Sequence, residues 1–217
     1  MSFKSELLQA VSDWRLLKHP FYQAWEHGEV SRETLKTYAR QYYHHVEAFP
    51  RYLSATHSGC QDAAARQELL KNLIDEELGT QNHPELWMQF AEGLGNDRAA
   101  VKTEKLRPET TDLIDTFLEI SSSSYAEGLC ALFMYEEQTP EIATTKMDGL
   151  RKHYGVSDTK TLGYFDLHES MDIEHSAATG ELVDRLPASQ HAQAIQSTRR
   201  AAQALWRFLD GMQELNT

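Results

Sequence analysis

The 217-residue sequence predicts an all-α fold, arranged as one compact bundle of helices. Glycine and proline number only 11 and 6, so the chain has few of the residues that form turns. No Asn-Gly or Asp-Gly pair stands between alternating β-branched residues, which is the pattern of a β-hairpin. Apolar residues instead recur every three or four positions, as they do on one face of a helix. The length fits a single domain, residues 1–217.

The spacing of apolar residues also predicts the individual helices. It is clearest in three sets, each of which marks one buried helix face. The sets are Leu7, Val11 and Trp14; Tyr38, Tyr42, His45, Phe49 and Tyr52; and Ile195, Ala202, Leu205, Leu209 and Met212. Helices are expected at about residues 3–17, 20–27, 32–57, 61–79, 84–94, 110–136, 140–154, 159–185 and 189–214. Ser31 is the expected N-cap of the third helix, and Gly155 is the expected C-cap of the seventh.

Prolines and polar stretches predict where the helical pattern is interrupted. Pro50 and Pro84 each lack a backbone N–H donor, so kinks or restarts are expected at both. Residues 96–109 are polar, lack an apolar stripe and are expected to form a loop. Four serines at 121–124 lie inside the expected helix 110–136, where small residues would let two helices approach closely.

The charge and the cysteines exclude several classes of protein. The formal net charge is −12 and no block of Lys and Arg occurs, so nucleic acid is not an expected partner. The N-terminus lacks the apolar core of a signal peptide, and no apolar run approaches the roughly 20 residues of a membrane span. A cytoplasmic protein is expected. Cys60 and Cys130 are far apart, which fits reduced thiols rather than a disulfide framework or a zinc knuckle.

One stretch, LGYFDLHESMDIEHSAA, places two imidazoles and a carboxylate on one helix face. His168, Asp172 and His175 stand at positions i, i+4 and i+7, which lie within about 40° of one another on a helix. The arrangement fits a set of metal ligands. It also fits a solvated polar stripe on an acidic helix, so it needs support from other parts of the chain.

Two further segments supply that support. Glu76 and His83 are seven residues apart and would share a face if their helix continued, although Pro84 disfavours helical geometry at His83 and predicts a bend there. Glu136 follows a strongly apolar run, where a buried carboxylate must be paired, protonated or bound to metal. The alternatives are an exposed acidic patch around Glu76 and a helix end in water at Glu136.

Together these three segments contribute two glutamates, one aspartate and three histidines. Mixed carboxylate and imidazole ligands in a helix bundle are typical of paired iron or manganese ions that activate dioxygen, whereas structural zinc favours thiolates. The Asp-x-x-His spacing of Asp172 and His175 is similar to the Glu-x-x-His element of di-iron bundles. The combination therefore predicts a site for two transition-metal ions.

At this point the chain resembles a known family, the haem-oxygenase-like di-metal oxidases, and within it the group of the chlamydial protein associating with death domains. The resemblance covers about residues 14–212. Its motifs are HPFYQAW (19–25), LKTYARQYYHHVEAFPRYLSATHSGC (35–60), NLIDEELGTQNHPELW (72–87), YEEQTPEIATTK (135–146) and HESMDIEH (168–175). It implies a bundle of about seven helices, shared with thiaminase II (TenA) and pyrroloquinoline-quinone synthase (PqqC).

The resemblance also implies cofactors and an activity. The implied metal ligands are Glu76, His83, Glu136, His168, Asp172 and His175. They would hold two ions, Fe/Fe or Fe/Mn, with dioxygen as co-substrate and an external reductant. The group is implicated in making para-aminobenzoate for folate by consuming one of its own tyrosines. By motif, that tyrosine is Tyr22, with Tyr38 nearby and Lys146 as the nitrogen donor. Without the resemblance, the same residues would be core aromatics and a solvated lysine.

Other functional interpretations of the sequence stay open. A TenA-like or PqqC-like enzyme would act on an external small molecule. Cys130 lies near the thiaminase nucleophile but one position out of register, and Arg40 and Arg51 are the cations available for a polyacidic substrate. A metal-free protein-interaction module is a third reading, and a homodimer is a further expectation. The remaining histidines are expected to be structural or on the surface; they are His44, His45, His57, His153 and His191.

Overall fold

The computed structural model describes residues 2–216, apart from the side chains of residues 170–174. Within that part, ten α-helices and one π-helix follow one another, and no strand occurs. The α-helices are α1 (Phe3–Ala10), α2 (Pro20–His27), α3 (Arg32–Gly59), α4 (Ala63–Glu77), α5 (His83–Gly93), α6 (Arg98–Lys102), α7 (Pro108–Ser123), α8 (Tyr125–Gly149), α9 (Thr159–Asp184) and α10 (Ala188–Gln213). The π-helix, Leu150–Tyr154, continues from α8. The all-α prediction is confirmed, but the helices outnumber the seven or so that the resemblance implies.

Local side-chain chemistry sets several helix ends. Ser31 Oγ accepts a hydrogen bond from the backbone N–H of Thr34 (3.1 Å), so the predicted N-cap of α3 is confirmed. Asp62 caps α4 in the same way through the N–H of Ala65 (2.7 Å). Gly155 ends the π-helix with φ 69°, a left-handed conformation that glycine adopts without steric cost. The predicted C-cap is therefore also confirmed.

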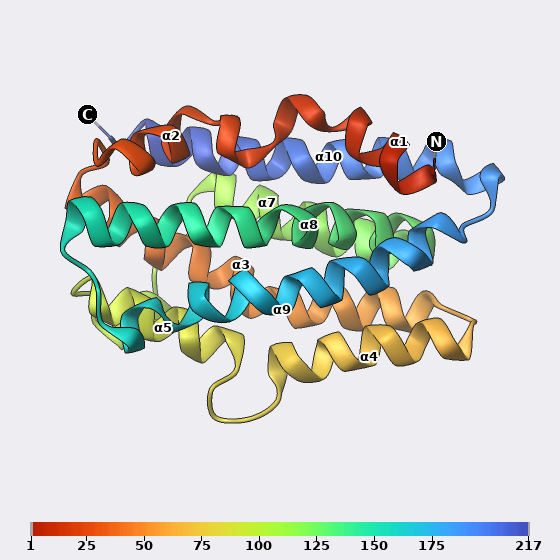
Figure 1. Ribbon diagram of the computed structural model, residues 1–217, viewed down its shortest axis with the longest axis horizontal. Coiled ribbons are helices and arrows are strands. Elements are labelled where there is room, and N and C mark those ends of the chain that lie inside the picture. Colours follow the sequence, from red (N-terminus) through yellow and green to blue (C-terminus); the bar gives the residue numbers. More distant parts are fainter. Residues whose placement is uncertain (1, 217) are drawn as a thin grey trace.

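The long helices lie side by side along the longest axis of the structure (Figure 1). α8 lies in the middle and contacts α9, α10, α7 and α3. α1 and α2 lie along α10 on one side, and α4 and α5 lie on the other side next to α9. Because α8 is enclosed by its neighbours, most of its side chains are buried, including the polar Glu136 and Lys146.

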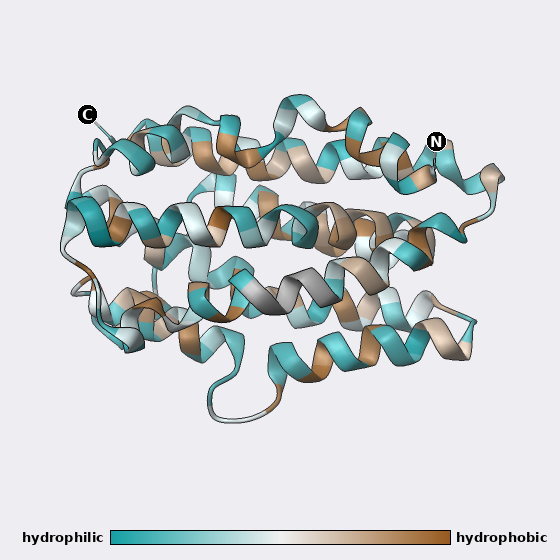
Figure 2. Cartoon of the chain, in the orientation of Figure 1, coloured by the Kyte–Doolittle hydropathy of each residue, from teal (hydrophilic) through white to brown (hydrophobic). Residues whose placement is uncertain are grey.

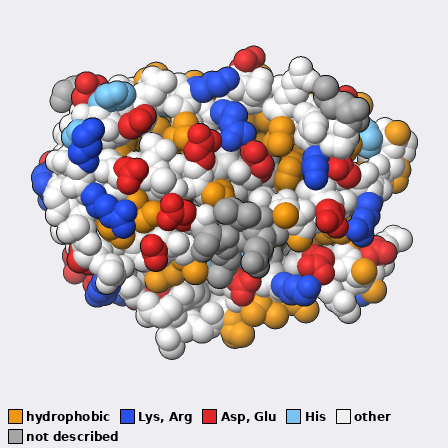
Figure 3. Space-filling view, in the orientation of Figure 1, with side chains coloured by type: hydrophobic (Ala, Val, Ile, Leu, Met, Phe, Trp, Pro, Cys, Tyr) orange, Lys and Arg blue, Asp and Glu red, His pale blue; other side chains and the backbone are white. Residues whose placement is uncertain are grey.

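Amphipathic helices build the core. Hydrophobic and hydrophilic residues alternate along the long helices (Figure 2), and side chains at the predicted apolar positions, such as Leu7, Tyr38 and Leu205, are buried. On the face drawn in Figure 3, acidic and basic side chains are interspersed. None of the helices in the described residues has the length and apolar character needed to cross a membrane.

The first predicted helix, residues 3–17, is too long. α1 ends at Ala10, and two short 3-10 turns follow, Ser12–Trp14 and Leu16–Lys18. The reason is a tertiary hydrogen bond, because the backbone N–H of Leu16 donates to Oε1 of Gln138 on α8 (3.0 Å) instead of continuing a helix. The chain is thereby held against α8 just before α2 begins.

The predicted helix 110–136 is in fact two helices that meet at Ser124. The backbone of Ser124 is extended, and its side chain accepts from the N–H of Glu127 (3.3 Å), which starts α8. The expected close approach is nevertheless present at Ser121. A Cβ atom added to Gly128 would lie 3.1 Å from the Ser121 Cα, so a side chain larger than glycine does not fit there.

Neither Pro50 nor Pro140 ends a helix. Pro50 lies inside α3 and Pro140 lies inside α8, so a restart at Pro50 and a separate helix from residue 140 are both wrong. Each proline removes one backbone hydrogen bond, but both helices are packed against several neighbours, and this packing outweighs the local cost. Residues 96–109 are not a continuous loop either, because they contain α6.

Candidate active site

Glu76 and His83 come from the facing ends of two helices. α4 ends at Glu77, and α5 begins at His83, where Asn82 caps it by accepting from the N–H of Glu85 (3.1 Å). The restart expected at Pro84 is therefore confirmed, and a helix that continues from Glu76 to His83 is wrong. Pro84 lies in the first turn of α5, where a proline loses no intrahelical hydrogen bond. Pro84 does not prevent His83 from reaching the site. It is part of the helix start that positions this histidine.

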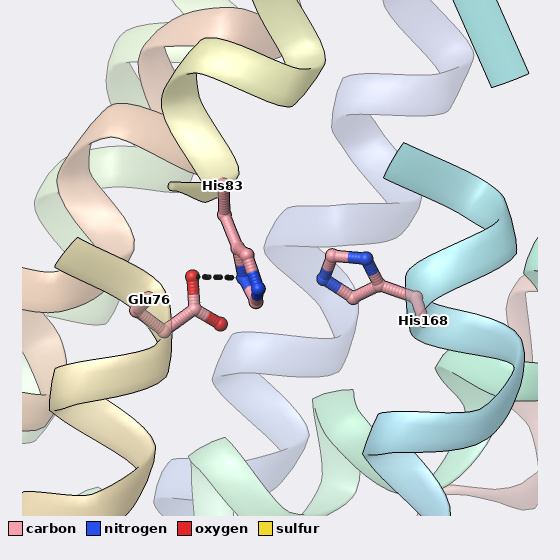
Figure 4. Close-up of side chains that lie close together, drawn as sticks. All are labelled: Glu76, His83 and His168. Atoms are coloured by element: carbon pink, nitrogen blue, oxygen red, sulfur yellow. Dashed lines mark ion pairs between the residues drawn. The ribbon is translucent and has the colours of Figure 1, made fainter. Parts of the chain in front are cut away.

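Glu76, His83 and His168 form the centre of the site. Figure 4 shows their side chains pointing toward one another from α4, from the start of α5 and from α9. One potential ligand atom from each lies within 4.8 Å of the others, and all three side chains are buried. The His83 and His168 rings are 4.4 Å apart between centroids. Residues 92 positions apart in the chain are thus brought to one point.

The polar atoms of this cluster are placed as ligand atoms would be. His83 Nδ1 is 2.6 Å from Glu76 Oε2, yet neither ring nitrogen of His83 has an aligned hydrogen bond among the described residues. His168 Nδ1 pairs with the carbonyl oxygen of Tyr164 (2.6 Å), which leaves Nε2 as the nitrogen with a lone pair. Burial, followed by the nearby His83, lowers the pKa of His168 well below its usual range. The neutral imidazole that a metal requires is favoured.

Glu136 of α8 lies next to Glu76 and His168. It lines one small cavity together with Glu76 and His168. Oε1 accepts a hydrogen bond from Asn72 Nδ2 (2.5 Å), and Oε2 is buried without a partner among the described residues. Burial, and to a smaller extent the charge of Glu76, raises the pKa of Glu136 to about 8. A cation would pair with Oε2 and would favour the charged form of the Glu136 carboxylate.

The two remaining predicted ligands are His175 and Asp172. His175 lies two turns beyond His168 on α9, and its Nε2 pairs with Asp75 Oδ2 of α4 (3.0 Å). It is not one of the three clustered residues, although it is close enough to lower the pKa of His168 slightly. Asp172 lies outside the described side chains. The structure thus brings together Glu76, His83, Glu136 and His168, with His175 beside them.

A second cluster contains Tyr22 of α2, Tyr38 of α3 and Lys146 of α8. The two hydroxyls are 3.0 Å apart, and Lys146 Nζ donates to the Tyr38 oxygen (2.7 Å). The same Nζ lies 4.6 Å from the centre of the Tyr22 ring. All three side chains are buried, which raises the pKa of both tyrosines well above 10.0 and lowers the pKa of Lys146 well below 10.5. Burial therefore favours the neutral form of the Lys146 amine, which faces an aromatic ring.

Tyr135 and Tyr164 connect the two clusters. Both line the cavity of Glu76 and His168, and both also line a second cavity that contains Tyr22 and Lys146. The Tyr164 ring is stacked on His168 with 4.0 Å between centroids. A wider groove of about 980 Å³ lies elsewhere, at the ends of α3 and α9, and includes no predicted site residue.

Sequence reasoning missed four residues that contact or line these clusters. They are Asn72, Asp75, Tyr135 and Tyr164. Two of them carried a signal, because Asn72 precedes Glu76 by four residues and Tyr164 precedes His168 by four, which places each pair on one helix face. Arg40, by contrast, is held by Glu104 and Asn96 and is not directed at either cluster.

The donor set of the first cluster fits a hard to borderline transition metal. Carboxylate and imidazole suit iron and manganese, and His83 Nε2 and Glu136 Oε2 are buried atoms without a hydrogen-bond partner among the described residues that would compete with a metal ion. Comparison with known proteins agrees, since residues 36–207 match a family model described as iron-containing redox enzymes. The chain belongs to this family. These residues and the family together indicate a metal site.

Individual relatives match nearly the whole length of this chain. It is 42% identical to a 4-aminobenzoate synthase of Nitrosomonas europaea, over 98% of this chain and 92% of that protein. It is 37% identical to a 4-aminobenzoate synthase of Chlamydia muridarum, over 99% and 91%. A solved TenA homologue from Pseudomonas syringae superposes with a TM-score of 0.84 at 18% identity, over 97% of this chain and 92% of that one. The haem-oxygenase-like fold is therefore confirmed.

Proposed function

We propose that this chain makes 4-aminobenzoate in an oxygen-dependent reaction and that its own Tyr22 supplies the aromatic ring. Relatives that are 42% and 37% identical carry the name 4-aminobenzoate synthase, which supports the product. The position of Lys146 supports the proposal that the chain consumes its own tyrosine. Its amine is buried, neutral and 4.6 Å above the Tyr22 ring, so a nitrogen donor and an aromatic acceptor are already in place within one chain.

The proposed ligands of the metal ions are Glu76, His83, Glu136, His168, Asp172 and His175. Bound iron, as Fe/Fe or as Fe/Mn, would supply oxidising power by reducing dioxygen with electrons from an external reductant. The chain supplies the ligand atoms and excludes water, because the cavity of Glu76, Glu136 and His168 is walled by Val46, Phe49 and the two tyrosines.

The roles of the second cluster follow from its contacts. Conversion of a tyrosine side chain to 4-aminobenzoate breaks the Cα–Cβ bond, oxidises Cβ to the carboxyl carbon and replaces the phenolic oxygen with nitrogen. Lys146 is the proposed nitrogen donor, since burial keeps its lone pair unprotonated. Tyr38 accepts from Lys146 and can donate its own proton to the Tyr22 oxygen, so it holds the amine and the phenol in one hydrogen-bonded chain. Self-consumption limits each chain to about one product.

The test is aerobic reconstitution with iron(II), manganese(II) and a reductant, followed by intact-mass measurement and peptide mapping. Protein labelled with ring-¹³C tyrosine and ε-¹⁵N lysine should give 4-aminobenzoate that carries both labels. The mass loss should map to the peptide with Tyr22, at a yield of about one product per chain. Unlabelled 4-aminobenzoate, or product formed while the protein mass stays unchanged, would overturn self-consumption.

A matched control distinguishes Tyr22 from tyrosines in general. Tyr22→Phe should form no product and keep its full mass, whereas Tyr43→Phe should react like the wild type because Tyr43 faces Glu47 on the far side of α3. Multiple turnovers by Tyr22→Phe would select an enzyme with an external small-molecule substrate. Less than about one bound metal ion per chain after loading would favour the protein-interaction alternative.

A further inference from the structure

α4 buries polar side chains as well as apolar ones. Its buried residues are Ala65, Leu69, Asn72 and Glu76, whereas Leu70 and Ile74 of the helix and its C-cap Leu78 are 43%, 44% and 72% exposed. Burial of leucine side chains would stabilise the fold, and burial of an amide or a carboxylate costs free energy unless a partner compensates it. Hydrophobic packing accounts for Leu69 and Ala65, but the burial of Asn72 and Glu76 is explained by the polar groups that they contact.

Asn72 contacts Glu136 of α8. Its Nδ2 donates to Glu136 Oε1 at 2.5 Å, across 64 positions of the chain, and the Asn72 side chain is buried. The bond has two consequences. It fixes the rotamer of a carboxylate that has no other partner on that oxygen, and it leaves Oε2 as the oxygen available to a metal ion.

Asp75 contacts His175 of α9 in a similar way. A carboxylate only accepts hydrogen bonds, so the 3.0 Å contact means that His175 Nε2 carries the proton and donates to Asp75 Oδ2. In a neutral imidazole the lone pair then belongs to Nδ1. Histidines that bind metal commonly donate their second N–H to a carboxylate, which fixes the tautomer and orients the ring.

We propose that Asn72 and Asp75 are positioning residues of the metal site, which hold Glu136 and His175 so that each presents one defined atom to metal. This inference rests on the metal site of the proposed function. α4 supplies one ligand of its own, Glu76, and orients one ligand from each of two other helices. The segment NLIDEE thus acts as the organising side of the site.

The test measures manganese(II) binding, which needs no turnover. Free manganese(II) gives a six-line electron paramagnetic resonance signal that disappears on binding, so titration of the full chain yields a dissociation constant. Asn72→Leu keeps the approximate shape of the side chain but removes the donor, and Asp75→Ala removes the acceptor. Each should weaken binding by roughly 10- to 100-fold, the usual loss when such a supporting partner is removed.

Controls separate positioning from folding. Glu77→Ala removes the same charge as Asp75→Ala from an exposed neighbour, and Gln67→Ala alters an exposed amide on the same helix; both should bind manganese(II) like the wild type. The melting temperature of every variant is also measured with excess chelator. Asp75→Asn, which can still accept from His175, should recover part of the lost affinity.

The outcomes are distinguishable. Weakened binding with an unchanged melting temperature in chelator supports the inference. Wild-type affinity in both Asn72→Leu and Asp75→Ala overturns the inference alone and leaves the metal site standing. A wild-type chain that binds no manganese(II) or iron(II) overturns both this inference and the proposed function.

Discussion

The carboxylate–imidazole cluster of Glu76, His83, Glu136 and His168 and the tyrosine–lysine cluster are built in opposite ways, although both lie in one core. In the cluster of Tyr22, Tyr38 and Lys146, every side-chain polar group has a hydrogen-bond partner within the cluster. In the carboxylate–imidazole cluster, His83 Nε2 and Glu136 Oε2 have none among the described residues. Buried polar atoms in native structures are rarely left without partners.

The difference indicates what each cluster needs from outside the chain. Orphaned ligand atoms are costly unless a metal ion completes them, so the first cluster is incomplete by itself. The second cluster is complete, because its nitrogen donor, its ring and the hydroxyl between them all belong to one chain. An enzyme with an external substrate would be expected to show the reverse, with unpaired groups in the substrate pocket.

The largest expected effect separates the two clusters. His83→Ala should lower manganese(II) affinity by ~100-fold or more and abolish 4-aminobenzoate, because it removes a ligand outright. Tyr22→Phe should abolish the product equally but leave metal affinity unchanged, since the hydroxyl that it removes pairs with Tyr38 in the other cluster. Metal titration and product assay on both variants test this. Loss of metal binding in Tyr22→Phe would show that the clusters are one site.

Removal of the Lys146 amine should abolish product formation and raise the free energy of unfolding. Lys146→Met keeps a long flexible side chain but lacks nitrogen, so product with lysine-derived nitrogen should be lost. The free energy of unfolding should rise by about 1 kcal/mol or more, since folding no longer strips a proton from a buried lysine. Denaturant unfolding with chelator present measures this. A fall in stability would mean that the Tyr38 contact outweighs the cost of burial.

The same substitution should change how stability depends on pH. The pKa of Lys146 is lowered in the folded chain, so between that value and about 10.5 the unfolded state binds more protons than the folded state. This lysine therefore makes stability rise with pH over that window. Subtraction of the Lys146→Met unfolding profile from the wild-type profile between pH 6 and 10.5 isolates the effect, because Glu136 and His168 titrate in both. A difference that does not vary with pH would contradict a neutral Lys146.

Several features of the fold were predictable because they depend on local chemistry. Ser31 and Gly155 act through their own neighbours in the chain, and both predictions are confirmed. The predictions that are wrong depend on distant contacts. Leu16 donates to Gln138 of α8, and Pro140 is carried through α8 by packing on several sides. A proline or an apolar spacing does not report such partners.

The candidate site shows the same division. His168 and His175 could be singled out because helical spacing puts them on one face, and Glu136 because it ends an apolar run. Asp75 could not, and the spacing of Asn72 from Glu76 does not reveal its partner, since these residues act on side chains 100 and 64 positions away that only the fold brings near. Pro84 allowed two interpretations, because a proline disrupts the interior of a helix but fits its first turn.

The smallest expected effect concerns Cys130, the residue that a thiaminase-like mechanism would use. Its thiol is fully buried and burial raises its pKa to about 12, so it is protonated at neutral pH and is not a nucleophile. Cys130→Ala should leave the yield and rate of 4-aminobenzoate within twofold of the wild type and cost ~1 kcal/mol of stability through the small cavity it creates. Product assay and denaturant unfolding check both values. A tenfold loss of product at unchanged metal affinity would instead place chemistry at this thiol and favour an external substrate over Tyr22.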